Sequence, residues 1–322
     1  TAGLAKMKGK LLTAGPREEV AAINGAAEFL ANPNSIILVG ERAAQTPGAL
    51  SAVAELATKT GARLAWIPRR AGDRGALDAG LLPIGGRNTT EIISATGSAI
   101  KGLVIGGVGA EDVDGDLVAA IERASFVVSL ETRHTDVTAL AHVVFPVAVV
   151  TEKRGTFRNW EGRNRSFDVV TPTPGALSDA AVLGEIAREL GSEISATDFW
   201  ASAAKPALSA GAAENSTIRA GEAILSTWRH LLDKGTLQSG EPYLAATSRV
   251  AVVRVSPNTA QSLGLVDGGS ASVTCCGNTA TAPVIVTGGM VDGVVWVPAN
   301  SEGSSLNIPS GCVVTVKAGG NA

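Results

Sequence analysis

A short basic segment near the middle of the chain, residues 151–168, carries the side chains best suited to bind an anion. Its cations are Lys153, Arg154, Arg158, Arg163 and Arg165. Residues 151–167 contain these five cations and only two acids, Glu152 and Glu161, and the segment ends at Asp168. This local surplus of positive charge contrasts with the whole chain, whose formal charge is −3. Clustered guanidinium and ammonium groups bind phosphates and carboxylates through charge-assisted hydrogen bonds.

Small and polar residues in the same segment add neutral binding groups. Gly155 and Gly162 allow backbone amides to turn outward. A hydroxyl, an amide and an indole N–H come from Thr156, Asn159 and Trp160. The segment is therefore suited either to a phosphorylated ligand or to an acidic protein surface, and the residues alone leave both open.

The three cysteines and three histidines indicate no metal site. They are Cys275, Cys276 and Cys312, and His134, His142 and His230. None belongs to a CxxC pair, to an HExxH motif or to another spacing typical of zinc or iron–sulfur ligands. The cysteines stand in apolar, strand-like runs, which is typical of thiols in a reducing compartment.

Composition indicates a folded protein of about two domains. The 322 residues are 45% hydrophobic and 18% charged, a balance typical of globular chains. The longest apolar run, residues 139–150, is too short to span a bilayer and is interrupted by His142 and Pro146. We therefore expect any membrane association to come through partners.

The first half of the sequence predicts an α/β fold. Apolar runs typical of buried strands occupy residues 35–39, 63–67, 102–105, 126–130 and 143–146. Apolar residues at helical spacing occupy residues 16–30, 48–60, 88–97, 114–124 and 178–190. This alternation predicts a Rossmann-like parallel sheet covered by helices on both faces. Ligands of such sheets lie outside the carboxyl ends of the strands, and segment 151–168 follows the last strand at that edge.

A glycine-rich turn, GGVG at residues 106–109, invites a dinucleotide-binding interpretation. Matching it to GxGxxG places Asp112 at the third glycine, where a carboxylate would face the pyrophosphate. Glu131 stands at a distance along the chain suited to a ribose contact. A plain tight turn nevertheless explains residues 106–109 better.

A second basic, glycine-rich stretch, RRAGDRGALDAG, covers residues 69–80. It is interpreted either as a solvated connection tied by weak Arg–Asp pairs or as a contact with a neighbouring subunit. Neither basic segment has the pattern typical of a nucleic-acid-binding surface, so nucleic acid is not an expected partner.

The second half of the chain changes to strands and turns. Residues 192–245 are rich in Ala, Ser and Gly and predict a helical or irregular connector, with one amphipathic helix near residues 218–232. Strand-like runs then occupy residues 249–255, 270–275, 279–286, 293–298 and 312–317, with a short helix at 256–264. Several short strands in so small a piece predict a closed, all-β barrel over residues 246–322, after an α/β domain at residues 1–191.

Two long runs resemble the molybdopterin oxidoreductase superfamily. Residues 254–300 resemble its molybdopterin dinucleotide-binding domain in the order short helix, LGLVDG, strand, hairpin, APVIV and GVVWVP. Residues 143–163 resemble the family's ADVVLP…E-x-x-GTF-x-N-x-EGR run, with His142 in place of the acidic residue. Within that superfamily, the runs at 69–83 and 175–191 resemble the family of G subunits of bacterial NADH-quinone oxidoreductases, in their carboxyl-terminal part.

The resemblance implies a Rossmann-like domain followed by a double-psi-type barrel, and it implies a cofactor site. In molybdenum relatives, the loop that corresponds to residues 151–168 helps to grip the pterin dinucleotide. The candidate cofactor-binding residues carried over in this way are Thr156, Asn159, Glu161, Gly162 and Arg163. In the respiratory family the fold is generally kept without this cofactor, so these residues are expected to be vestigial. No catalytic or metal-binding residue is expected.

The same resemblance implies a cellular setting. It implies the peripheral arm of a proton-pumping NADH:quinone oxidoreductase, held at the cytoplasmic face of the membrane by other peripheral-arm subunits. Because the chain begins at Thr1 without a signal segment, we expect it to be processed or part of a longer subunit. The iron–sulfur clusters of that subunit would lie upstream.

The residues are compatible with three functions. The first is a redox-silent scaffold, in which the cationic segment pairs with carboxylates and replacement of Arg163 by alanine weakens assembly. The alternative is the molybdopterin guanine dinucleotide-binding half of a formate-dehydrogenase-like molybdenum or tungsten oxidoreductase, with Thr156 and Asn159 on the cofactor and the metal ligand on another segment. A free-standing NAD enzyme explains the first half but not the barrel.

Overall fold

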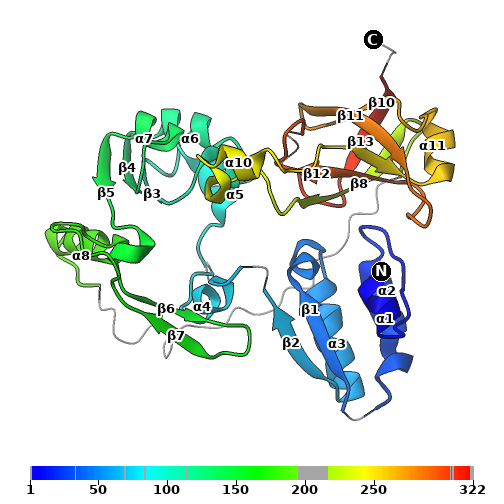
Figure 1. Cartoon of the computed structure of the whole chain (residues 1–322), viewed down its shortest axis with the longest axis horizontal. Coiled ribbons are helices and arrows are strands. Elements are labelled where there is room, and N and C mark those ends of the chain that lie inside the picture. Colours follow the sequence, from blue (N-terminus) through cyan, green and yellow to red (C-terminus); the bar gives the residue numbers. More distant parts are fainter. Residues whose placement is uncertain are drawn as a thin grey trace. The chain divides into compact units, whose positions relative to one another are not determined.

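The chain forms two compact units, which are described separately (Figure 1). The computed structural model describes residues 2–32, 34–68, 70–82, 85–113, 115–194, 217–304, 306 and 308–319. The first unit comprises residues 1–67, 208–234 and 240–322, and the second comprises residues 68–207 and 235–239.

Helices and strands alternate in the first half, and strands dominate the second. The α-helices are α1 (Ala2–Lys6), α2 (Glu19–Gly25), α3 (Ala49–Thr60), α4 (Asp73–Asp78), α5 (Thr89–Ala95), α6 (Leu117–Arg123), α7 (Asp136–Leu140), α8 (Asp179–Glu189), α10 (Pro242–Ala245) and α11 (Pro257–Leu263). The strands are β1 (Ile36–Gly40), β2 (Arg63–Ile67), β3 (Gly102–Gly106), β4 (Phe126–Glu131), β5 (Val143–Pro146), β6 (Gly155–Arg158), β7 (Asn164–Phe167), β8 (Glu222–Arg229), β9 (Val253–Val255), β10 (Ser270–Cys275), β11 (Asn278–Val286), β12 (Val294–Ala299) and β13 (Val313–Ala318). Short 3₁₀ helices occupy Ala26–Leu30, Glu41–Gln45, Ala110–Asp112, Val150–Glu152 and Thr236–Gln238.

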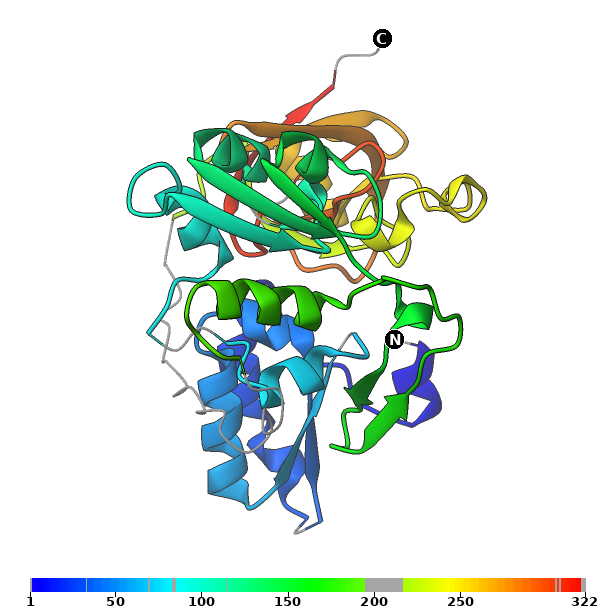
Figure 2. The same cartoon turned by 90° about the vertical axis from the view of Figure 1, so that its left-hand side faces the viewer.

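The second unit is built on a parallel sheet in the order β3-β4-β5. Helices α6 and α7 cover one face, where Ile121, Val127 and Val137 belong to one buried cluster (Figure 2). On the other face Leu130 packs with Val182 of α8. This arrangement confirms the predicted α/β class.

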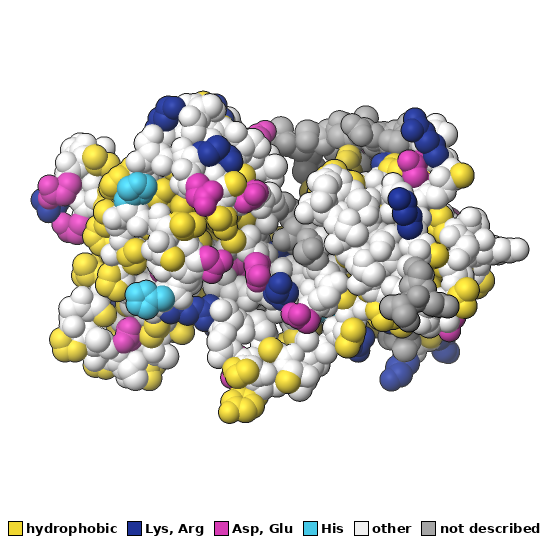
Figure 3. Space-filling view, turned by 90° about the horizontal axis from the view of Figure 1, so that it is seen from above, with side chains coloured by type: hydrophobic (Ala, Val, Ile, Leu, Met, Phe, Trp, Pro, Cys, Tyr) yellow, Lys and Arg dark blue, Asp and Glu magenta, His cyan; other side chains and the backbone are white. Residues whose placement is uncertain are grey.

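The surface of the second unit above α6 and α7 mixes side-chain types (Figure 3). On this face hydrophobic side chains lie between acidic side chains and scattered cations. The strongest local concentration of one charge in the unit's sequence is instead the cationic segment that contains β6 and β7.

The first unit contains a small parallel pair and a closed barrel. Strands β1 and β2 pair in parallel, and α3, whose ends are Gly48 and Gly61 in the left-handed region, buries Val53 and Leu56. The barrel has the strand order β10-β11-β9-β12-β8-β13, which confirms the predicted barrel. Its fully buried side chains include Leu225, Val253, Val255, Val273, Val284, Val295, Val297, Leu306 and Val314.

Local sequence signals explain two features of the barrel. The β10–β11 hairpin turns at Cys276 and Gly277, whose φ angles of 52° and 80° are those of a two-residue type I′ turn. Helix α11 begins after Ser256, whose hydroxyl accepts from the Thr259 N–H, and ends at Gly264 in the left-handed region.

The amphipathic helix expected near residues 218–232 was wrong. This segment contains β8, an eight-residue strand that pairs in parallel with β12 and antiparallel with β13. Helical spacing of its apolar residues misled the interpretation, because a strand with neighbours on both sides is buried nearly continuously. Ile224, Thr227 and Trp228 are residue types that favour strands. Residues 195–216 of the expected connector lie outside the described residues.

Among the described residues, no helix is both long and apolar enough to cross a membrane.

Candidate functional site

Within the basic segment 151–168, residues 155–167 form a β-hairpin. Strands β6 and β7 pair antiparallel, with Phe157 opposite Arg165 and Arg158 opposite Asn164. Because side chains alternate along a strand, Phe157 and Arg165 lie on one face of the hairpin, and Arg158 and Asn164 lie on the other. The two faces have different surroundings.

The tip of the hairpin is closed by its own polar groups. Asn159 Oδ1 accepts a hydrogen bond of 2.9 Å from the Arg163 N–H, and Asn159 Nδ2 donates to Glu161 at 3.2 Å. The Arg163 guanidinium lies 3.5 Å from the Glu161 carboxylate. Gly162 has a φ of 84°, a conformation that glycine adopts without strain, and its N–H donates to the Asn159 carbonyl. Four of the five candidate cofactor-binding residues therefore engage one another.

The fifth candidate, Thr156, lies apart from the tip on β6. Its hydroxyl is 3.4 Å from the hydroxyl of Ser166 on the neighbouring strand. Arg163 is exposed, so its ion pair with Glu161 contributes little to stability, and we expect a larger effect from a more buried arginine.

That arginine is Arg158, on the face opposite Phe157. Asp78 of α4 accepts hydrogen bonds of 2.8 Å from both Arg158 and Arg74. The side chains of Asp78 and Arg158 are only 25% and 18% exposed. Burial alone would raise the pKa of Asp78, but the hydrogen bonds from Arg158 and Arg74 outweigh it and hold that pKa below its usual value.

Asp78 thus joins the two basic segments that the sequence singled out separately. Sequence reasoning anticipated Arg–Asp pairs within residues 69–80, and Arg74 and Asp78 form one. It missed the pairing of Asp78 with Arg158, eighty positions along the chain. The only signal available was the surplus of cations in each segment.

Two further cations of the hairpin region have carboxylate partners. Lys153 contacts Asp179, the first residue of α8, at 2.5 Å, and exposed Arg154 lies 3.9 Å from Asp168. Within the part of the chain that the structure describes, the Arg165 side chain has no hydrogen-bond or ion-pair partner. Four of the five cations are therefore neutralised within the unit, and Arg165 is not.

A small cavity of about 260 Å³ lies beside Arg165. Its lining residues are Pro68, Arg70, Ala71, Phe157, Asn159, Trp160 and Arg165. Sites for small molecules and cofactors usually measure roughly 300–1,000 Å³, so this cavity suits a side chain better than a dinucleotide. A cavity of this volume would not enclose a pterin dinucleotide.

The glycine-rich turn at residues 106–109 is occupied by the chain itself. The Gly109 N–H donates to Asp112 Oδ2 at 3.0 Å and lies at the same distance from the Thr236 hydroxyl. Asp112 also accepts from the Thr236 N–H at 3.0 Å. The carboxylate stands where a pyrophosphate would need a free amide, which supports a plain turn.

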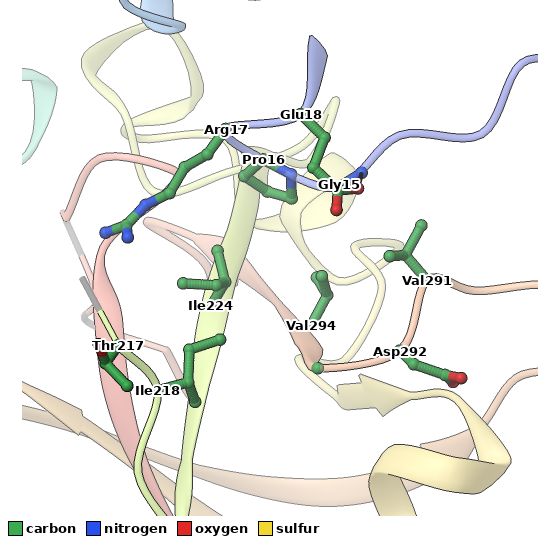
Figure 4. Close-up of a pocket in the computed structure, with 11 residues that line it drawn as sticks. Gly15, Pro16, Arg17, Glu18, Thr217, Ile218, Ile224, Val291, Asp292 and Val294 are labelled. Atoms are coloured by element: carbon green, nitrogen blue, oxygen red, sulfur yellow. Dashed lines mark hydrogen bonds between the residues drawn. The ribbon is translucent and has the colours of Figure 1, made fainter. Parts of the chain in front are cut away.

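The first unit has a cavity of about 300 Å³ between the segment before α2 and the barrel strands (Figure 4). In Figure 4 the Arg17 side chain points away from Glu18 and Asp292. Arg17 Nε donates to the Gly311 carbonyl at 2.7 Å, and Glu18 accepts from the Gly15 N–H at 2.8 Å. Asp292 accepts hydrogen bonds from the Ser256 and Asn258 side chains. Because the charged groups of this cavity serve the chain's own polar groups, it is a weaker candidate than the hairpin.

The three cysteines are free and share one end of the barrel. The Cys275 and Cys276 sulfur atoms lie 3.0 Å apart, and Cys275 and Cys312 both pack against the barrel core. Burial, with the neighbouring Cys276 and Cys312 thiols, raises the pKa of Cys275 to about 12. Among the described residues, no group of His, Cys, Asp and Glu is arranged to hold a metal ion.

This geometry predicts selective thiol chemistry. At neutral pH, N-ethylmaleimide should modify exposed Cys276 at least about tenfold faster than Cys275, because the thiolate is the reactive form. Peptide mass spectrometry after short exposures measures both rates, and unfolding in guanidinium should make them similar. Faster modification of Cys275 in the folded protein would contradict the assignment.

Two family models match successive parts of the chain. The family model described as Molybdopterin oxidoreductase matches residues 12–189, and the one described as Molydopterin dinucleotide binding domain matches residues 224–321. The second match begins inside β8.

Curated relatives match nearly the whole chain. The G subunit of NADH-quinone oxidoreductase from Mycobacterium bovis is 42% identical over 377 residues, covering 99% of this chain and 46% of the relative. The G subunit of the same enzyme from Streptomyces coelicolor is 36% identical over 375 residues, covering 97% of this chain and 44% of the relative. The chain therefore spans about half the length of these relatives.

Solved structures give weaker likenesses. Acetylene hydratase from Pelobacter acetylenicus has a TM-score of 0.47 at 15% identity, covering 66% of this chain and 39% of that one. The designed protein mkDPBB_sym_86 has a TM-score of 0.21 at 16% identity, covering 30% of this chain and 90% of that one. Both scores are too low to bear on function. With the family model matching more than half of its residues, the chain belongs to the molybdopterin oxidoreductase family.

Proposed function

We propose that this chain is a redox-silent scaffold portion of the large peripheral-arm subunit of a proton-pumping NADH:quinone oxidoreductase. The two relatives from that enzyme, at 42% and 36% identity, support the choice of complex. The electron carriers would lie in the remainder of that subunit and in other subunits. The protein would be held peripherally at the cytoplasmic face of the membrane by its partners.

The observation that carries the redox-silent role is the self-satisfied hairpin tip. Asn159, Glu161 and Arg163 use their polar groups on one another, so a cofactor phosphate would have to displace these contacts. These contacts support a segment that binds no pterin cofactor and supplies no catalytic residue.

A scaffold also needs stable contacts within itself, and the hairpin supplies them. Asp78 ties α4 to the hairpin through Arg158, and Lys153 ties the start of the hairpin to α8 through Asp179. A hairpin joined to two helices by ion pairs is suited to keep its shape against neighbouring subunits.

The proposal is tested by isolating the full-length protein with an affinity tag from its own cells. We expect flavin-containing and iron–sulfur subunits to co-purify, together with NADH-dependent quinone reduction. A matched preparation from untagged cells is the control for carry-over. Isolation of the protein alone, or with the subunits of a different oxidoreductase, would contradict the proposal.

A further inference from the structure

The two faces of the β6–β7 hairpin have opposite roles in packing. The Arg158 face lies against α4 through the Asp78 contact. The opposite face carries Phe157 and Phe167, whose rings are stacked with centroids 5.3 Å apart. A Cβ atom at Gly155 would lie 2.5 Å from the Phe167 ring, so the glycine makes room for this stack. The aromatic face is therefore an ordered surface.

This ordered surface leaves large aromatic side chains in contact with solvent. Phe157 is 45% exposed and Trp160 is 46% exposed. Both line the cavity of about 260 Å³ beside Arg165. Tryptophan and arginine are enriched among the residues that dominate the energy of protein–protein interfaces, especially around a central pocket.

Arg165 gives this surface its chemical preference. Its guanidinium has no partner within the described part of the chain, whereas the other four cations of the hairpin region each have a carboxylate. An arginine beside aromatic rings forms bidentate hydrogen bonds with a carboxylate more strongly than an ammonium group does. Arg165 is therefore available to pair with a carboxylate from outside the unit.

The size of the cavity and the charge of the surface limit which class of partner can bind there. The cavity admits a side chain and is smaller than usual small-molecule sites. Nucleic acid binding relies on several unpaired cations along a backbone, and among the described residues this face presents one such cation, Arg165. An acidic protein segment with one inserted apolar side chain fits both limits.

We propose that Phe157, Trp160 and Arg165 form a docking surface for an acidic segment of a neighbouring subunit. A carboxylate of that segment pairs with Arg165, and an adjacent apolar side chain enters the cavity between the aromatic residues. This inference rests on the proposed function, because it requires the chain to lie within a multisubunit oxidoreductase.

The surface is tested by photo-cross-linking in the full-length protein. p-Benzoylphenylalanine replaces Trp160, cells are irradiated, the complex is isolated, and the cross-linked peptides are sequenced by mass spectrometry. We expect a cross-link to an Asp- or Glu-containing segment of another subunit. The same amino acid in place of Phe126, which is 50% exposed at the amino end of β4 in the same unit, should not reach that segment. Cross-links confined to the chain itself, or to nucleic acid or lipid, would overturn the inference.

Charge reversal tests the role of Arg165 in the same complex. After salt washes, the amount of Arg165→Glu subunit that remains in the complex should be lower than that of the wild-type subunit by about tenfold or more. The reason is that two carboxylates would then face each other. Arg154→Glu makes the same change at another exposed position of the hairpin region, beside Asp168, and should have little effect. Replacing the cross-linked partner carboxylate with lysine should restore retention of the Arg165→Glu protein.

The outcomes separate this inference from the proposed function. If the tagged protein co-purifies with flavin and iron–sulfur subunits while position 160 forms no cross-link and Arg165→Glu is retained normally, the docking surface is refuted and the scaffold stands. If no such subunits co-purify, both are refuted.

Discussion

Replacing Leu225 with alanine should lower the free energy of unfolding of the barrel by about 3 kcal/mol, the usual range for a buried leucine being roughly 2–5 kcal/mol. Leu225 is 0% exposed and lies in the middle of β8, next to Val295 of β12. Truncation removes apolar contacts and leaves a void that a closed barrel cannot easily fill. The effect should be large because β8 has barrel strands on both sides.

The matched control lies six residues along the same segment. Leu231 is 94% exposed, so Leu231→Ala should change the free energy of unfolding by less than about 0.5 kcal/mol. Hydrogen exchange of the barrel amides in guanidinium measures both variants in the intact protein. Equal effects of the two substitutions would mean that residues 222–229 are not a buried barrel strand.

Asp78→Asn should have the second large effect and lower the free energy of unfolding of its unit by about 2 kcal/mol. Hydrogen bonds to charged groups contribute about 1.5–3 kcal/mol to stability. The neutral amide would leave Arg158 and Arg74 without their shared carboxylate in a partly buried place. The hairpin should then detach from α4, and amides of β6 should exchange faster. In the complex, the same change should reduce the amount of assembled subunit.

The pH dependence of this effect has a defined sign. The pKa of Asp78 is lowered in the folded protein, so its stabilising effect is present above the unfolded value, about pH 4, and is lost as the pH falls through the folded value. The difference between the wild-type protein and Asp78→Asn should therefore shrink in acid.

Glu185→Gln provides the control for Asp78→Asn. It removes an exposed ion pair with Arg188 on α8, and such pairs contribute roughly 0–1 kcal/mol. Denaturant titrations across the acid range measure all three proteins. If Asp78→Asn had the same free energy of unfolding as the wild-type protein at neutral pH, the role given to this carboxylate would be contradicted.

Elements set by local chemistry were predictable from the sequence. The two-residue turn at Cys276 and Gly277 and the cap residues Ser256 and Gly264 needed only neighbouring residues. Strand β8 was not predictable in this way, because its neighbours β12 and β13 lie far along the chain. The hairpin strands β6 and β7 are only four residues long and highly polar, so they resembled a loop.

The candidate site was predictable as a segment but not as a set of contacts. Composition pointed to residues 151–168, and the structure shows there a closed tip at Asn159 and Glu161. Which of its cations are paired depends partly on Asp78 and Asp179. These carboxylates lie far from the segment along the chain, so the sequence does not indicate that they pair with it. Long-range ion pairs leave no periodic pattern in a sequence.

The redox silence of this segment is tested most directly by elemental analysis for molybdenum and tungsten. The sample is the intact complex, isolated from cells that are supplied with both metals, and its flavin and iron–sulfur subunits are identified by mass spectrometry. For a redox-silent scaffold we expect both metals at amounts far below stoichiometric. Near-stoichiometric molybdenum or tungsten would contradict the proposed function and would make the hairpin tip at residues 159–163 part of a cofactor clamp.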